Sequence, residues 1–336
     1  MVLAGKLSRV DLPPDIFAVV MATGIVSVAA DDRHYPRISD ALAALASAAF
    51  LLLTVGLIVR VVARPRSAVG EIGDPDVALR MFTAVAACSV LGVRFDRHPP
   101  IVWLLGIASL AAWLLLVPLA VRDVASRPRA ELRDHVHGAW LLASVGTAGL
   151  GITAADLAVH GRSSTLLLVA VAFWLLGLAG YLAVTWLIAW RAVAAPLVPD
   201  QITPDSWILM GALAIATVTG DHVLLAAGRV GVTGLGWVRP VTFVLWVLAS
   251  LWIPVLLYAE LWRVDSRVGS LHFAGVWWSA VFPLGMYAAA TAETASVQHR
   301  PPLVTISLVL FWVAFTVWLL VAVGLVHRAV SALRIR

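Results

Sequence analysis

Residues 164–190 read STLLLVAVAFWLLGLAGYLAVTWLIAW and contain no Asp, Glu, Lys, Arg or His. A charge-free run of this length predicts an α-helix that crosses a lipid bilayer, because about 20 apolar residues span the hydrocarbon core. Similar charge-free runs occupy residues 41–59, 101–121, 240–259 and 302–326. The sequence therefore predicts an all-α membrane protein.

The composition of the chain bounds the number of such helices. Of its 336 residues, 61% are hydrophobic and 13% are charged, whereas about 45–50% of residues are apolar in soluble domains. This excess excludes a water-soluble enzyme and leaves room for at most about ten spans. Five further apolar segments alternate with the charge-free runs and bring the number to ten. The connections are short, so we expect residues 1–336 to form a single ten-span transport domain.

The basic residues are distributed unevenly between the two sides of these spans. Lys and Arg are about twice as frequent on the side of the two termini, which predicts a multi-pass protein of the inner membrane with both termini in the cytoplasm. They are scattered over short loops, so we expect no nucleic-acid binding. The single cysteine, Cys88, cannot form an intrachain disulfide or hold a metal alone. We expect neither a metal nor a cofactor.

The five alternating, odd-numbered segments differ from the charge-free runs because they carry small and polar residues. Such residues mark either close helix contact, as in small-xxx-small faces, or a hydrated path. Because they recur in every odd segment, we favour a path. The candidate pore-lining residues are Thr23, Gly24, Ser27, Thr83, Ser89, Ser144, Thr147, Thr217, Gly220, Ser279 and Met286.

A repeat links the odd segments. Each begins near an aromatic residue, and these aromatics lie 58 to 70 residues apart. An acid follows each aromatic by 14 to 16 positions. A period of two spans predicts five helical hairpins, which can close a quasi-fivefold ring with the odd helices inside, around a central pore. The aromatics are Phe17, Phe82, Trp140, Trp207 and Trp277, and the acids are Asp31, Asp96, Asp156, Asp221 and Glu293.

The ninth segment contains the most specific local feature, the stretch SAVFPLGM at residues 279–286. Pro283 and Gly285 weaken a helix at this point and form a candidate hinge. At helical spacing, Phe282 shares a face with Met286 and Glu293. If that face lines the pore, Phe282 would act as a gate; alternatively, its ring packs against a neighbouring helix.

Acids and histidines occur together where the odd segments end. Asp221 precedes His222, and Glu293 is followed by His299. A histidine near a carboxylate can titrate close to neutral pH and make an outer mouth pH-sensitive. Ordinary solvated loop polarity also explains these residues. The candidate outer-mouth residues are Asp221, His222 and Glu293.

Two of these stretches resemble a known family. The sequences FAVVMATGIVS at residues 17–27 and WWSAVFPLG at residues 277–285 are similar to the tellurite-resistance/C4-dicarboxylate transporter family, which includes malate carriers, sulfite efflux pumps and the plant slow-type guard-cell anion channels. The resemblance implies a quasi-fivefold barrel of hairpins, assembled as a homotrimer with one pore in each subunit. It also implies that a phenylalanine of the ninth span, here Phe282, occludes the pore.

The expected function is the transport of small inorganic or carboxylate anions. No fixed charge lies in the middle of the odd segments, and weak hydroxyl and backbone donors favour passage over capture. The alternative is a proton-linked carrier of C4-dicarboxylate, sulfite or tellurite, in which Asp221, His222 or Glu293 handles the proton. No nucleophile with its base lies at membrane depth, so we do not expect an enzyme.

Overall fold

The computed structural model describes residues 13–63, 75–194, 196, 198–266 and 275–334, and within these ranges it contains helices and no strand. The longer helices are α2 (Ala18–Asp32), α3 (Pro36–Ala63), α6 (Phe82–Arg94), α7 (Pro99–Ser126), α9 (Leu142–Gly161), α10 (Ser164–Ala194), α11 (Ile208–Val230), α12 (Val238–Ser266), α13 (Trp278–Val297) and α14 (Pro302–Arg334). The short ones are α5 (Pro75–Arg80), α8 (Arg129–His135), η1 (Gly138–Leu141), η2 (Pro199–Gln201), η3 (Pro204–Trp207) and η4 (Gly275–Trp277).

Eight helical stretches within the described ranges are long and apolar enough to cross a membrane. Five of them contain the charge-free runs: α3, α7, α10, α12 and α14. The others join a short helix to a long one, at Asp76–Arg94, Gly138–Gly161 and Pro204–Val230. The predicted all-α membrane class is confirmed at this level.

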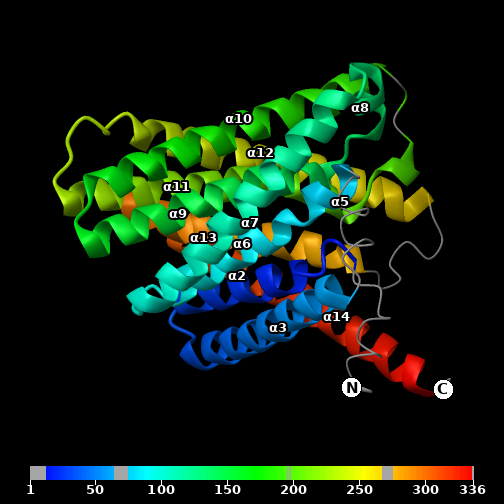
Figure 1. Cartoon of the computed structure of the whole chain (residues 1–336), viewed down its shortest axis with the longest axis horizontal. Helices are drawn as coiled ribbons and strands as arrows, with labels where there is room; N and C mark the ends of the chain where they lie inside the picture. Colours follow the sequence, from blue (N-terminus) through cyan, green and yellow to red (C-terminus); the bar gives the residue numbers. More distant parts are fainter. Residues whose placement is uncertain (1–12, 64–74, 195, 197, 267–274, 335–336) are drawn as a thin grey trace.

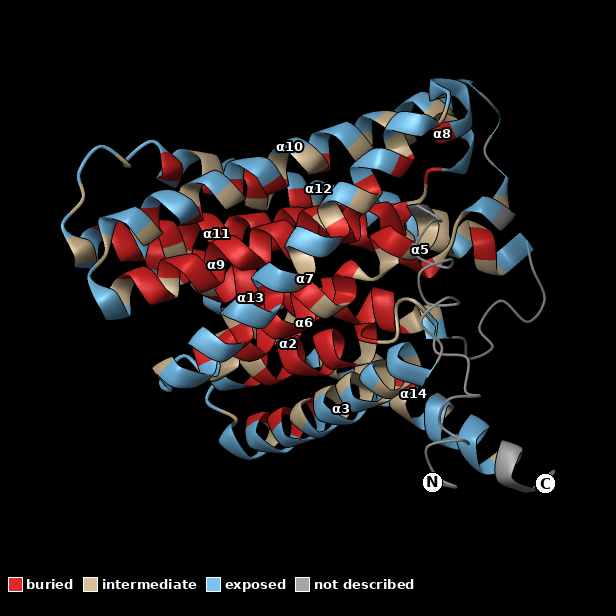
Figure 2. Ribbon diagram, in the orientation of Figure 1, coloured by how far each residue is buried: buried red, intermediate tan, exposed pale blue. Residues whose placement is uncertain are grey.

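Burial divides these helices into two groups. The charge-free helices α3, α7, α10, α12 and α14 have only 17% to 28% of their most apolar windows buried, whereas the stretches that contain α6, α9 and α11 have 67% to 83% buried. Most residues of α2 and α13 are buried as well. We call α2, α6, α9, α11 and α13 the inner helices and the charge-free group the outer helices. Figure 2 shows the inner helices largely in red.

The inner helices contact one another in an order that closes. The neighbouring pairs are α2 with α6, α6 with α9, α9 with α11, α11 with α13, and α13 with α2. Each outer helix also packs against the inner helix that precedes it in the chain, as Figure 1 shows for α2 with α3 and for α9 with α10. The five inner helices thus contact one another in a closed sequence, and each outer helix packs against one of them.

Glycines allow α13 to approach both of its inner neighbours closely. A Cβ atom at Gly285 would lie 2.8 Å from Cγ2 of Ile25 in α2. A Cβ atom at Gly211 in α11 would lie 2.9 Å from the Pro283 ring. Real Cβ contacts are longer, so any larger residue at either position would push α13 outward.

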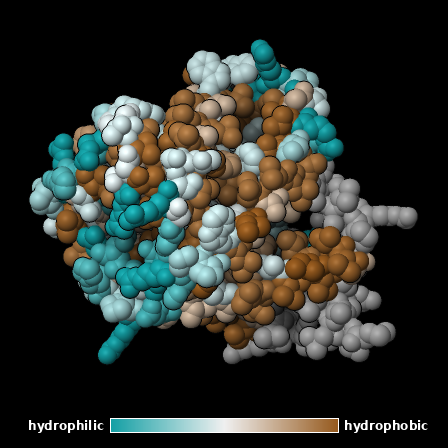
Figure 3. All heavy atoms as spheres, turned by 60° about the vertical axis from the view of Figure 1, so that its left-hand side comes forward, coloured by the Kyte–Doolittle hydropathy of each residue, from teal (hydrophilic) through white to brown (hydrophobic). Residues whose placement is uncertain are grey.

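The surface of the molecule matches a membrane environment. Large apolar side chains of the outer helices are exposed, including Leu52, Leu182 and Leu320. Figure 3 shows hydrophilic side chains at the left and again at the upper right of the view, and hydrophobic ones over much of the surface between them. Exposed apolar area of this extent is expected where lipid, and not water, covers the helices.

Candidate functional site

A cavity of about 450 Å³ opens between the inner helices, toward the end at which they terminate. Every inner helix contributes to its wall, with Ile25 from α2, Ser89 from α6, Ile152 from α9, Ile215 from α11 and Met286 from α13. The cavity therefore lies among all five inner helices. We call it the outer cavity.

Charged side chains of both signs line the rim of the outer cavity. The guanidinium of Arg94 donates from Nε to Oγ of Ser27 at 3.0 Å and from Nη2 to Oδ1 of Asp40 at 2.6 Å. Its charge is therefore held beside the opening by α2 and α3. The other charged residues of the wall are Asp31, Asp32, Arg33, Asp96, Arg97, His222 and Glu293.

His222 is bound on both sides by carboxylates from other inner helices. Its Nδ1 lies 2.6 Å from Oδ1 of Asp156 in α9, and its Nε2 lies 3.1 Å from Oε1 of Glu293 in α13. Both contacts can be hydrogen bonds at once only when the cluster holds one proton more than a neutral imidazole and two carboxylates, either on the second ring nitrogen or on one of the carboxyl groups. The cluster thus joins α9, α11 and α13 and forms a site on the cavity wall that can hold a proton.

Asp221 lies apart from this cluster, although it is the sequence neighbour of His222. It is fully buried, and its Oδ2 accepts a bond from Thr294 at 3.2 Å. It does not line the outer cavity. Asp221 and His222 thus make different contacts although they are neighbours in the chain, because successive residues on a helix point in different directions.

Phe282 continues the face of α13 that lines the outer cavity. Met286, Ala289 and Glu293 lie on this wall, and Phe282 precedes Met286 by about one helical turn. Pro283 contacts α11 at Gly211, and Gly285 contacts α2. The face between these two contacts is the one that lines the cavity. Phe282 is fully buried on that face.

A second cavity, of about 380 Å³, lies where the inner helices begin. We call it the inner cavity. Val276, near the start of α13, belongs to its wall, and Phe282 follows six positions later in the chain. In the order of the chain, Phe282 thus falls between Val276 on the wall of the inner cavity and Met286 on the wall of the outer cavity. The remaining wall residues of the inner cavity are Arg80, Asp134, His135, His137, Arg191, Gln201, Thr203 and Asp205.

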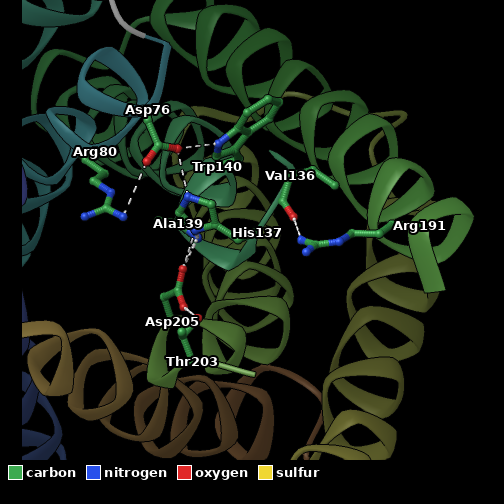
Figure 4. A network of polar contacts seen from close by, with 9 residues as sticks. All are labelled: Asp76, Arg80, Val136, His137, Ala139, Trp140, Arg191, Thr203 and Asp205. Carbon is green, nitrogen blue, oxygen red and sulfur yellow. Dashed lines mark hydrogen bonds and ion pairs between the residues drawn. The ribbon is translucent and has the colours of Figure 1, made fainter. Parts of the chain in front are cut away.

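A histidine also organises the inner cavity (Figure 4). The Nδ1 of His137 lies 2.6 Å from Oδ2 of Asp205, and its Nε2 lies 2.8 Å from Oδ1 of Asp76. Trp140 donates to Asp76 at 2.9 Å, and the backbone N–H of Ala139 donates to Asp205 at 2.8 Å. Burial lowers the pKa of His137, but its bonds to Asp205 and Asp76 outweigh burial and raise the pKa to about 9. The network ties together the starts of α5, η1 and η3.

Residues 11–326 match the family described as voltage-dependent anion channel, or SLAC1. The chain belongs to the SLAC1 family. Two proteins of Methanocaldococcus jannaschii are both named uncharacterized transporters. One is 23% identical over 94% of this chain and 94% of its own length. The other is 22% identical over 91% of this chain and 90% of its own length. An uncharacterized membrane protein of Mycobacterium tuberculosis is 31% identical over 46% of this chain and 78% of its own length.

The family match confirms the resemblance drawn from residues 17–27 and 277–285. The SLAC1 family is one of anion channels, and the archaeal relatives are named transporters, so both point to a transporter and not an enzyme. The relatives' names also agree with the apolar helices in making this chain a multi-pass membrane protein.

Several of the hydroxyl groups that were predicted to line a pore form hydrogen bonds with outer helices in this SLAC1-family chain. The Oγ1 of Thr23 accepts a bond from Nε1 of Trp318 at 3.0 Å, and the Oγ1 of Thr147 accepts one from Nε1 of Trp113 at 2.9 Å. Ser144 donates to a backbone carbonyl of α10 at 2.5 Å. These hydrogen bonds hold α2 to the outer helix α14, and they hold α9 to the outer helices α7 and α10.

The other predicted lining residues have several different surroundings. Ser89 and Met286 line the outer cavity. Ser27 exchanges bonds with Ser39 of α3, and Ser279 is buried. Thr83 and Thr217 donate to backbone carbonyls of their own segments, at Arg80 and Leu213, and Gly24 and Gly220 lie tightly against Val90 and Thr242.

Some residues of both cavities were not singled out from the sequence. Arg94, Asp76 and Asp205 are examples of such residues. The partners of these side chains lie 54 to 68 residues away in the chain. No local pattern in the sequence indicates such contacts, because they form only when separate hairpins pack together.

Proposed function

We propose that this SLAC1-family protein conducts small inorganic or carboxylate anions along the axis of its inner helices, with Phe282 as the gate between the outer and inner cavities. One observation carries the proposal: Phe282 extends, by one helical turn, the face of α13 that lines the outer cavity. Pro283 and Gly285 follow Phe282 directly in the chain and serve as the hinge, since both weaken the helix at that point.

The membrane arrangement belongs to the same proposal. Ten helices cross the bilayer as five hairpins in a quasi-fivefold ring, both termini lie in the cytoplasm, and the single domain assembles as a homotrimer with one pore in each subunit. The closed order of contacts among the inner helices supports the ring. α2 and α13 can be less apolar than a lipid-facing helix, because most of their residues are buried within the protein.

Selectivity arises from the cost of removing water from the anion and not from tight binding. Below its charged rim, the outer cavity is walled by apolar side chains such as Ile25, Val90 and Ile215. Conduction requires binding that is weak enough to permit exit, and such walls satisfy this condition. In this proposal Ser89 and Met286 line the path directly, while Thr23, Ser144 and Thr147 hold its walls in place.

A second candidate is a proton-linked carrier of C4-dicarboxylate, sulfite or tellurite. The observation that favours it is the position of His222 between Asp156 and Glu293 on the wall of the outer cavity. A proton held there could be coupled to anion passage. Flux that saturates at low substrate and depends on a proton gradient, both of which His222→Gln removes, would establish the carrier in place of the channel.

Anion flux from proteoliposomes tests the gate. Phe282→Ala is expected to raise the flux above that of the parent protein, and a tenfold rise corresponds to a barrier lower by about 1.4 kcal/mol. Phe311→Ala is the matched control, because Phe311 of the outer helix α14 is also fully buried but stacks on Tyr35 and Phe315. Equal flux from the parent and Phe282→Ala would remove the gate from the proposal.

A further inference from the structure

A groove of about 530 Å³ lies outside the ring of inner helices, between α8 and the end of α10. These two helices contact each other and lie together in Figure 1. The groove is apolar except at its rim. Its walls are formed by Leu132, Ala183, Trp186, Leu187 and Trp190, and Arg129 lies at the edge.

The groove lies at the level of a membrane boundary. Trp186 follows the start of α10 at Ser164 by 22 residues, which is about 33 Å of helix and close to the thickness of the hydrocarbon core. The charge-free part of α7 also ends nearby in the chain, at Val121, shortly before α8 begins. Indole rings prefer this boundary, and the Trp186 side chain is 72% exposed there.

Arg129 supplies a positive charge without a carboxylate partner. Its basic neighbours in the chain are compensated, since Arg127 lies 3.4 Å from Glu131 and Arg133 lies 2.7 Å from Asp134. Within the described part of the chain, no acidic group lies within 4.0 Å of the Arg129 guanidinium. An apolar groove at the membrane boundary is thus bordered by one uncompensated cation.

We infer that this groove binds an anionic phospholipid, with one acyl chain along Trp186, Leu187 and Leu132 and the phosphate on the Arg129 guanidinium. Arginine matches phosphate in geometry and charge. In the topology proposed above, the ends of α7 and α10 face the cytoplasmic leaflet, where anionic lipid attracts basic groups. The site lies outside the conduction path, so it does not depend on the proposed gate, but its place in the cytoplasmic leaflet rests on the topology proposed above.

Native mass spectrometry of the delipidated protein tests the site. We expect dioleoyl-phosphatidylglycerol to bind about fivefold more tightly than dioleoyl-phosphatidylcholine, the factor that one arginine near a membrane surface provides. Arg129→Gln should remove this preference, because it weakens the binding of phosphatidylglycerol more than that of phosphatidylcholine, whose choline already compensates the phosphate charge. Trp186→Ala should weaken the binding of both lipids, because it removes the wall against which the acyl chain packs.

Arg122→Gln is the matched control, because Arg122 is also near the end of α7 but pairs with Asp123 at 3.1 Å and does not line the groove. It should retain the preference for phosphatidylglycerol. Equal binding of the two lipids by the parent protein, or a preference that survives Arg129→Gln, would overturn the inference. Lipid binding that appears only after the oligomer is dissociated would also overturn it and would identify the groove as a contact between subunits.

Discussion

His137 makes the stability of this protein depend on pH in the alkaline range. Its pKa is raised from 6.5 to about 9, because bonds to Asp205 and Asp76 outweigh the effect of burial. Each pKa unit corresponds to about 1.36 kcal/mol, so the protonated ring contributes about 3 kcal/mol to the free energy of unfolding. The side chain is only 21% exposed, so solvent screens this contribution weakly. Arg80 and Arg191 are the other cations at this cavity, and Arg80 faces Asp76 at 3.5 Å.

The sign of the effect follows from the direction of the shift. A group whose pKa is higher in the folded state than in the unfolded state stabilises the fold when it is protonated. The contribution of His137 is therefore fully present below about pH 6.5 and is lost as the pH rises through about 9. Replacement by Gln removes the charge, and it leaves the carboxylate of Asp205, which is buried, without its cationic partner.

Thermal unfolding in detergent, measured between pH 6 and pH 10, checks this prediction. The melting temperature of the parent protein should fall across the alkaline part of this range, whereas that of His137→Gln should be lower at pH 6 and should change less. His135→Gln serves as the control, since His135 is exposed and bonds only to the carbonyl of Glu131 in its own helix. If His137→Gln and the parent protein show parallel pH profiles, the proton on His137 does not stabilise the fold.

Three other changes test the packing and the charge around the inner helices. Gly285→Val should cost about 1–3 kcal/mol of stability, because even a Cβ atom there would lie 2.8 Å from Ile25; an unchanged melting temperature would show that α13 can move away from α2. Trp318→Phe should cost about 1 kcal/mol through loss of the bond to Thr23, and the loss should not add to that of Thr23→Val. Arg94→Gln should reduce anion flux from the outer side, most strongly at low ionic strength; equal flux at every salt concentration would show that this charge does not attract the anion.

The separation of inner from outer helices was predictable because it depends on local composition. A run such as residues 164–190 has no polar group that needs a protein partner, so it can face lipid. The segments with glycines and hydroxyls need protein or water around them, and the structure buries them inside. The position of Phe282 relative to Met286 and Glu293 was predictable for the same reason, since residues on one helix keep a fixed spacing.

The orientation of each hydroxyl was not predictable in this way. Thr23 and Thr147 occur on helices that line a cavity, yet their side chains point to tryptophans of outer helices. The rotation of a helix about its own axis depends on how its side chains interlock with those of several neighbours. A single sequence shows which residues a helix contains and not which of its faces meets which partner.

Long-range pairs divide in the same way. The acids and histidines where the odd segments end were visible in the sequence. The ion pairs of His222 are made, however, with Asp156 and Glu293, which lie 66 and 71 positions away in the chain. Hydropathy is a property of neighbouring residues and needs about 20 of them to place a helix in a membrane. Contacts between hairpins exist only after α9, α11 and α13 have packed, so their chemistry arises from the assembled ring of helices.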